Sequence, residues 1–132
     1  MRFFTHLNIL IAGDFITLAI VTLVGFASHG TAGTAGARML TTFIPLAAAW
    51  ILIAPFLHVY SIENALDGRQ LWRPIWAMVI AAPMAAWLRG MMLSSPILPV
   101  FVLILGGVSV AAIFFWRGLF WLVASRLKRA DG

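Results

Sequence analysis

Four stretches of the sequence are apolar over about twenty residues or more, and their length limits what the chain can form. A helix rises about 1.5 Å per residue, so about 20 apolar residues cross the ~30 Å hydrocarbon core of a bilayer. The fourth stretch is long for a single crossing. The sequence therefore predicts an all-α polytopic membrane protein, a four-transmembrane-helix bundle, with spans at about 7–27, 39–60, 74–93 and 97–124.

The composition agrees with a chain that is surrounded by lipid. Of its 132 residues, 63% are hydrophobic and 10% are charged, whereas a soluble domain carries roughly 25% charged residues. A membrane β-barrel is disfavoured, because its strands alternate apolar and polar residues. No linker divides the chain, so we expect a single integral membrane domain over residues 1–132. Its net charge of +5 comes mostly from span ends, where lipid headgroups are the natural partners and nucleic acid is not.

Lysine and arginine are unevenly divided between the two sides that four spans define. The side of both termini carries six of them: Arg2, Arg69, Arg73, Arg126, Lys128 and Arg129. The other side carries Arg38 and Arg89. Because cytoplasmic loops hold the excess of positive charge, we expect a multi-pass plasma-membrane protein with both termini in the cytoplasm. The alternative is a cleaved signal peptide, and the acid in the middle of its apolar region argues against it.

That acid, Asp14, is the most unusual residue of the first span. An aspartate at a helix centre costs about 2.5–3.5 kcal/mol on the insertion scale, so we expect its side chain to face the bundle. At 100° per residue, Val21, Gly25 and Ser28 lie close to its direction. Small residues let a second helix approach, so this stripe is predicted to be a helix-packing face.

Two arginines are candidate partners for the carboxylate. Arg117 enters the fourth span from the same side as Asp14, whereas Arg89 lies roughly 12 Å higher by the rise of a helix. We therefore expect Asp14 to pair with Arg117. Arg89 then needs other acceptors, such as carbonyls freed by proline, or the far interface. The alternative is structural: both arginines extend to the interfaces, and Asp14 is neutral and hydrogen-bonded to a neighbouring helix.

Prolines and tryptophans add expectations about helix shape and depth. Pro45 and Pro55 fall in the second span and Pro83 in the third, where each removes an amide donor and favours a kink. Four tryptophans gather near the predicted cytoplasmic interface, as in an aromatic belt: Trp72, Trp76, Trp116 and Trp121.

Residues for catalysis or metal binding are few. The chain has no cysteine, and its three histidines are not spaced as metal ligands. Ser28 and His29 are adjacent, but no acid lies nearby to orient the histidine as a general base. No phosphate-binding loop or dinucleotide fingerprint is present. We expect no cofactor and no enzymatic activity.

Four short motifs, taken in order and spacing, resemble the signature of the DUF3054 family: Gly13-Asp14, Gly25 to His29, Leu88-Arg89 and Trp116-Arg117. These are small bacterial and archaeal membrane proteins of unknown function, and the resemblance covers nearly the whole chain. Phe26 stands where the family has arginine, and Phe115 where it has glycine. The resemblance implies a four-helix membrane domain and a polar cluster of Asp14, Ser28, His29, Arg89 and Arg117. It supplies no activity.

The sequence is compatible with three functions. The first is a non-enzymatic accessory or structural subunit, or small membrane module, whose partners are the bilayer and other membrane subunits or a second copy. The alternative is a small proton-coupled transporter or channel acting as a homodimer, in which Asp14 exchanges a proton and an arginine gates the path. The third is a membrane enzyme using Ser28 and His29, which has the least support.

Overall fold

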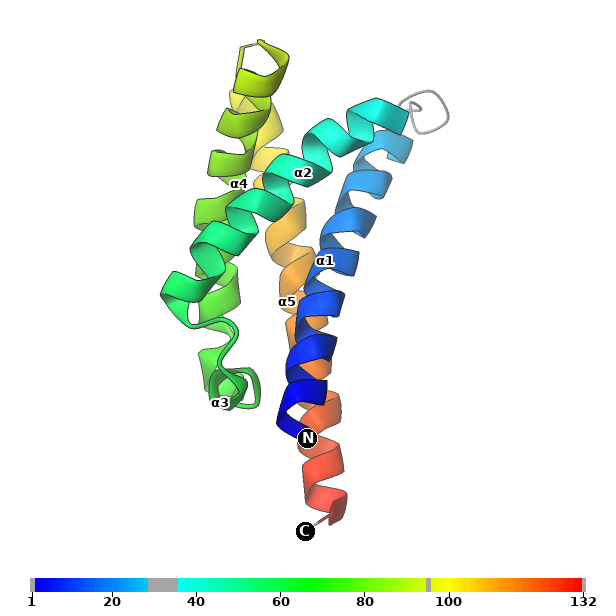
Figure 1. The fold of residues 1–132 in the computed structure, drawn as a ribbon, viewed down its shortest axis with the longest axis vertical. Helices are drawn as coiled ribbons and strands as arrows, with labels where there is room; N and C mark the ends of the chain where they lie inside the picture. Colours follow the sequence, from blue (N-terminus) through cyan, green and yellow to red (C-terminus); the bar gives the residue numbers. More distant parts are fainter. Residues whose placement is uncertain (1, 29–35, 95, 132) are drawn as a thin grey trace.

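The computed structural model describes all residues except 1, 29–35, 95 and 132. The described residues form helices and no strand (Figure 1). In chain order the helices are α1 (Arg2–Ser28), α2 (Gly36–Ile53), η1 (Ala54–Leu57), α3 (Ile62–Ala65), η2 (Gly68–Gln70), α4 (Trp72–Leu93) and α5 (Pro99–Asp131). Four of the described helices are long and apolar enough to cross a membrane. The expectation of an all-α polytopic membrane protein with four spans is confirmed.

The four long helices run up and down, with α1 against α2, α2 against α4, α4 against α5 and α5 against α1. Both termini and the short helix α3 lie at one end of the bundle, which we call the terminal end (Figure 1). The opposite end, where α4 ends and α5 begins, we call the distal end. With its 33 residues, α5 is about 50 Å long. It therefore exceeds the ~30 Å core of a bilayer, and it continues past the predicted boundary at residue 124.

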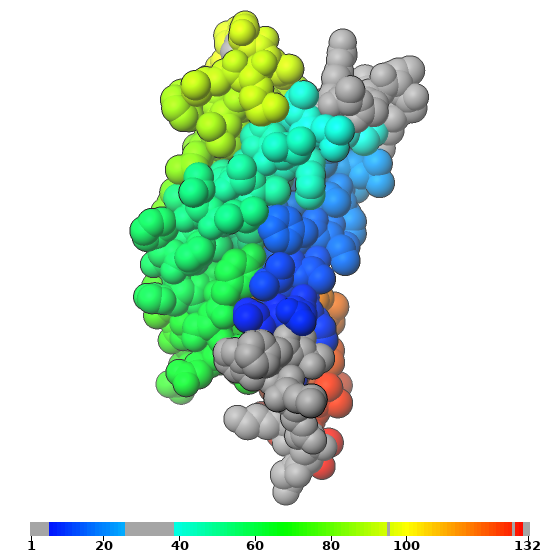
Figure 2. Space-filling model, in the orientation of Figure 1, coloured from blue at the N-terminus to red at the C-terminus, as the bar shows by residue number. Residues whose placement is uncertain are grey.

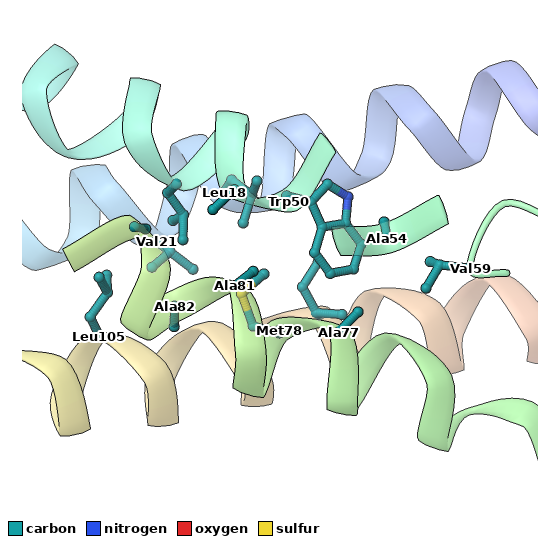
Figure 3. Packing of buried hydrophobic residues seen from close by; sticks show 14 residues of the cluster. Leu18, Val21, Trp50, Ala54, Val59, Ala77, Met78, Ala81, Ala82 and Leu105 are labelled. Atoms are coloured by element: carbon teal, nitrogen blue, oxygen red, sulfur yellow. The ribbon is translucent and has the colours of Figure 1, made fainter. Parts of the chain in front are cut away.

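The centre of the bundle combines one large indole with a row of alanines (Figure 3). Trp50 of α2 is fully buried and packs with Leu18, Leu46 and Met78. The face of α4 that meets it is built from small side chains: Ala77, Ala81, Ala82, Ala85 and Ala86. Small residues let helix backbones approach closely in lipid, where dispersion contacts replace the hydrophobic effect between helices.

Large apolar side chains cover the outside of the bundle. Phe56, Leu103 and Phe115 are 81%, 75% and 76% exposed. In Figure 2, α1, α2 and the connection before α4 form a continuous surface on the face turned to the reader. A surface of this kind is suited to acyl chains and not to water.

The second span ends earlier than its apolar pattern predicts. α2 stops at Ile53, and Pro55 lies in the short helix η1 and does not kink a longer one. His58 then adopts a left-handed conformation (φ 55°), and the Val59 amide donates to the Ala54 carbonyl at 3.2 Å. This turn buries Val59 and leaves Tyr60 beyond the helix, although the pattern places it inside the span. Proline has no amide hydrogen, so one bond of the ladder is lost at Pro55, and the left-handed conformation of His58 then ends the helical path.

The other two prolines differ from Pro55. Pro45 and Pro83 lie within α2 and α4, and both helices continue past them.

The expected packing face of α1 also needs a correction. Val21 is buried as expected, but Gly25 is exposed. The buried line runs through Leu10, Asp14 and Leu18 to Val21 and Thr22. Gly25, beyond it, is exposed because it lies at the cavity.

Candidate functional site

A buried ion pair joins the first helix to the last. The Nε atom of Arg117 donates to Oδ1 of Asp14 at 2.9 Å, and Nη2 donates to Oδ2 at 2.5 Å. The side chains are 3% and 0% exposed. Two parallel hydrogen bonds match the planar guanidinium to the planar carboxylate, which is the strongest arrangement of this pair.

Neighbouring groups take up further hydrogen-bonding capacity of the pair. Trp116 Nε1 donates to Asp14 Oδ1 at 3.0 Å, and Arg117 Nη1 donates to the carbonyl of Val59 at 2.9 Å. The Tyr60 ring lies 5.3 Å from the guanidinium carbon of Arg117, within the range of a cation–π contact. The carboxylate thus accepts three hydrogen bonds, and its charge is neutralised within the protein.

Gly13 makes this arrangement sterically possible. The Trp116 indole lies directly over the Gly13 backbone, and a Cβ atom added there would overlap its six-membered ring. The neighbouring Thr17 hydroxyl donates to the Gly13 carbonyl at 2.7 Å. Only glycine lets the indole come near enough to hydrogen-bond Asp14. Trp116, expected in the interfacial belt, is half-buried and packs against α1.

Tyr60 closes the terminal side of the ion pair. Its hydroxyl accepts a hydrogen bond from Trp50 Nε1 at 2.6 Å. Burial raises the pKa of Tyr60 far above its ordinary value of 10.0, and the negative charge of Asp14 raises it further. Tyr60 is therefore neutral over the whole physiological range.

The raised pKa leads to a testable pH dependence. Tyr60 is the single tyrosine of the chain, so phenolate absorbance reports its ionisation alone. We expect none near pH ~10 while the protein is folded, and ionisation at that pH once it is unfolded. Above pH ~10 the unfolded state binds fewer protons than the folded state, so stability decreases as the pH rises. Tyr60→Phe should reduce that decrease; a folded-state midpoint near ~10 would contradict the burial argument.

Arg89 occupies a separate site at the distal end. Its Nε donates to Thr42 Oγ1 at 3.1 Å, and its guanidinium carbon lies 5.0 Å from the ring centre of Phe101. The sequence suggested a backbone carbonyl freed by proline as an acceptor for Arg89. The acceptor of this bond is instead the hydroxyl of Thr42. Along α5, Phe101 and Arg117 are separated by about 24 Å, so the two arginines do not share one cluster.

A cavity of about 570 Å³ opens beside Arg89. All four long helices contribute to its wall, and apolar side chains dominate it. Its lining includes Val21, Thr42, Arg89, Phe101, Ile104 and Leu105. This volume falls within the ~300–1,000 Å³ that is usual for sites of small molecules.

Two buried hydroxyls lie on the cavity side of the ion pair, and one of them, Thr22, belongs to the cavity wall. Thr22 is eight residues above Asp14 in α1 and Ser109 eight residues before Arg117 in α5, so both lie about 12 Å from the pair. The Thr22 hydroxyl donates to the Leu18 carbonyl at 3.0 Å. The Ser109 hydroxyl is fully buried and has no hydrogen-bond partner among the described residues.

The structure thus divides the five residues that the sequence singles out. Asp14 and Arg117 are together, and Arg89 is remote from them. Ser28 ends α1, with its side chain outside the described part, and His29 lies outside the described residues. Within the described part of the chain, no three His, Asp or Glu side chains are grouped so as to hold a metal ion.

Sequence reasoning missed five contributors to these two sites. They are the Thr42 hydroxyl, the Phe101 ring, the Trp116 indole, the Val59 carbonyl and the Tyr60 ring. Gly13 beside Asp14 and Trp116 beside Arg117 offered a signal for the indole, because a glycine next to a buried charge permits close approach. No sequence signal indicates the Val59 carbonyl, which depends on the turn at His58.

Comparison with known proteins identifies the family. A family model described as "Protein of unknown function (DUF3054)" matches residues 11–120. This range contains the ion pair, Trp50, Trp116 and the Arg89 cavity. No curated protein and no solved structure matches the chain. The chain belongs to the DUF3054 family of membrane proteins.

Proposed function

We propose that the protein is a non-enzymatic membrane module that holds a hydrophobic molecule, taken from the bilayer, in the cavity at its distal end. The observation that carries the proposal is the cavity itself, about 570 Å³ in volume and lined mainly by apolar side chains within the membrane-spanning part. Ligand sites are typically concave, largely apolar and provided with a few polar groups. Arg89 and Thr42 are such groups here.

The hydrogen bonding of Asp14 supports a structural role for the ion pair. A proton-coupled transporter would need this carboxylate to release Arg117 and take up a proton in each cycle. Both carboxylate oxygens are engaged, by two side chains of α5. Buried pairs with such geometry hold helices in register, and removing one partner leaves an uncompensated charge. The pair therefore fits a fixed connection between α1 and α5 better than a moving part.

The proposal includes an orientation in the plasma membrane. The terminal end carries both termini, the connection with Arg69 and the first turn of α4 with Arg73, so most basic residues of the chain gather there. We place this end in the cytoplasm, following the usual excess of positive charge on that side. The cavity then opens near the outer leaflet. Lipid, a further membrane subunit or a second copy can approach it there.

Filling the cavity tests the proposal. A Cβ atom added at Gly25 meets nothing within 4 Å, and Gly25 lines the cavity, so Gly25→Leu should occupy the site without disturbing the bundle. We expect the wild-type protein, purified in mild detergent, to carry a bound hydrophobic molecule in native mass spectra. Gly25→Leu should lose most of it.

Gly107→Leu is the matched control, because a Cβ at Gly107 also meets nothing within 4 Å and this residue is not part of the cavity wall. It should retain the bound molecule at the wild-type level. Equal occupancy in all three proteins, or none in the wild type, would count against a ligand site in this cavity.

A further inference from the structure

The acids of the chain are placed so that none can neutralise Arg89. There are four in all. Asp14 is engaged by Arg117, and Glu63 and Asp67 lie in the connection at the terminal end. Asp131 is 30 residues beyond Phe101 in α5, which corresponds to about 45 Å. The guanidinium at the cavity therefore has no counter-charge from its own chain.

The described contacts of Arg89 are all with neutral groups. Nε donates to a threonine hydroxyl, and the guanidinium carbon faces an aromatic ring. Both contacts orient the side chain and leave its charge uncompensated. A cation in the membrane-spanning part of a protein ordinarily pairs with an anion or marks the path of a ligand. The terminal nitrogens of a guanidinium form a planar fork that fits a carboxylate with two parallel bonds.

The remaining wall of the cavity fits a hydrocarbon chain. Arg89 lies four residues before the end of α4, hence about 6 Å from the distal end of that helix. From Phe101, which faces Arg89, the wall continues through Leu105 to Val108, about 10 Å deeper along α5. A charged head would thus lie near the membrane surface, with its tail directed towards the bundle centre.

We propose that the cavity binds a single-chain carboxylate amphiphile, a fatty acid, with its carboxylate on Arg89 and its chain along α5. This assignment of ligand class rests on the proposed function of the cavity. One guanidinium balances one negative charge, and the Thr42 hydroxyl, which accepts from Arg89, holds the guanidinium in place for the head. The cavity volume suits one chain. A phosphate dianion would need a second cation, and the described wall supplies none.

Binding of radiolabelled palmitate to the purified protein in non-ionic detergent tests the assignment. Hydrogen bonds to charged groups are worth about 1.5–3 kcal/mol, so Arg89→Gln should weaken palmitate binding by roughly 10- to 100-fold. Methyl palmitate, which lacks the charge, should bind the wild type weakly and should bind Arg89→Gln equally weakly. Arg89→Lys should be intermediate, because it keeps the charge and loses the fork.

Arg126→Gln provides the control, since Arg126 is exposed near the far end of α5; it should bind palmitate like the wild type. All variants are compared at equal helicity and thermal midpoint, so that misfolding is recognised separately. Gly25→Leu should block palmitate and its ester alike.

The outcomes separate the two proposals. Equal binding of palmitate and its methyl ester, unchanged in Arg89→Gln but blocked in Gly25→Leu, would overturn the carboxylate assignment and leave the cavity as a ligand site. Tighter binding of lysophosphatidic acid than of palmitate would also overturn it. If neither palmitate nor its ester bound while the wild type still carried another molecule in native mass spectra, only the fatty-acid assignment would be overturned. If the wild type carried no molecule at all, or if Gly25→Leu blocked neither probe, the proposed function itself would fail.

Discussion

Replacing Asp14 with leucine is expected to lower the free energy of unfolding by about 3–5 kcal/mol, the range seen when one partner of a buried ion pair is removed. Arg117 would keep its charge at a site that is 3% exposed and would lose two of its hydrogen bonds. Titration with dodecyl sulfate in mixed micelles, followed by circular dichroism, measures the change. Glu63→Gln, an exposed acid outside the spans, should have no measurable effect.

The double variant Asp14→Leu, Arg117→Met separates pairing from simple damage. With both charges removed, no ion is left uncompensated, and apolar replacements of a buried pair are often neutral or stabilising. We therefore expect the double variant to be more stable than Asp14→Leu alone. If the two single losses simply added, the side chains would not be energetically coupled.

Gly13→Ala is expected to destabilise the protein by about 3 kcal/mol, the upper part of the usual range for overpacking. The added methyl group would overlap the Trp116 indole, so the ring must move and its hydrogen bond to Asp14 is lost. The shift should also appear as a change in tryptophan emission. The loss of stability is measured by the same detergent titration.

Gly25→Ala is the control in the same helix. A Cβ there meets nothing within 4 Å, and alanine has the higher helix propensity by up to about 1 kcal/mol. It should be neutral or slightly stabilising. Equal destabilisation at both positions would show that glycine in α1 matters for helix flexibility and not for contact with Trp116.

The parts of the fold that follow from local apolar length could be predicted. Four spans follow from the lengths of the four apolar runs, and the pairing of Asp14 with Arg117 follows from counting the helical rise from one side of the membrane. The distal site could not be derived in this way. Arg89 and Thr42, which share this hydrogen bond, are 47 residues apart in the sequence. The bond depends on how α2 crosses α4.

The helix wheel was right about Val21 and wrong about Gly25 for one physical reason. A wheel assumes that one face of a helix is packed along its entire length. In the structure α1 is packed along its middle, and Gly25 lies beside the cavity. The apolar pattern likewise could not reveal the end of α2, because Phe56, Leu57 and Val59 continue the apolar run past Pro55.

The ion pair has a consequence for how the chain is made. Asp14 and Arg117 are 103 residues apart, so at ~5–20 residues per second the ribosome delivers the acid roughly 5–20 s before its partner. During this interval Asp14 in the first span lacks the arginine that pairs with it, so the carboxylate must be sheltered by the insertion machinery. The connection between the first and the last helix therefore forms only when the final helix is complete. A nascent chain that ends before Arg117 cannot form this ion pair.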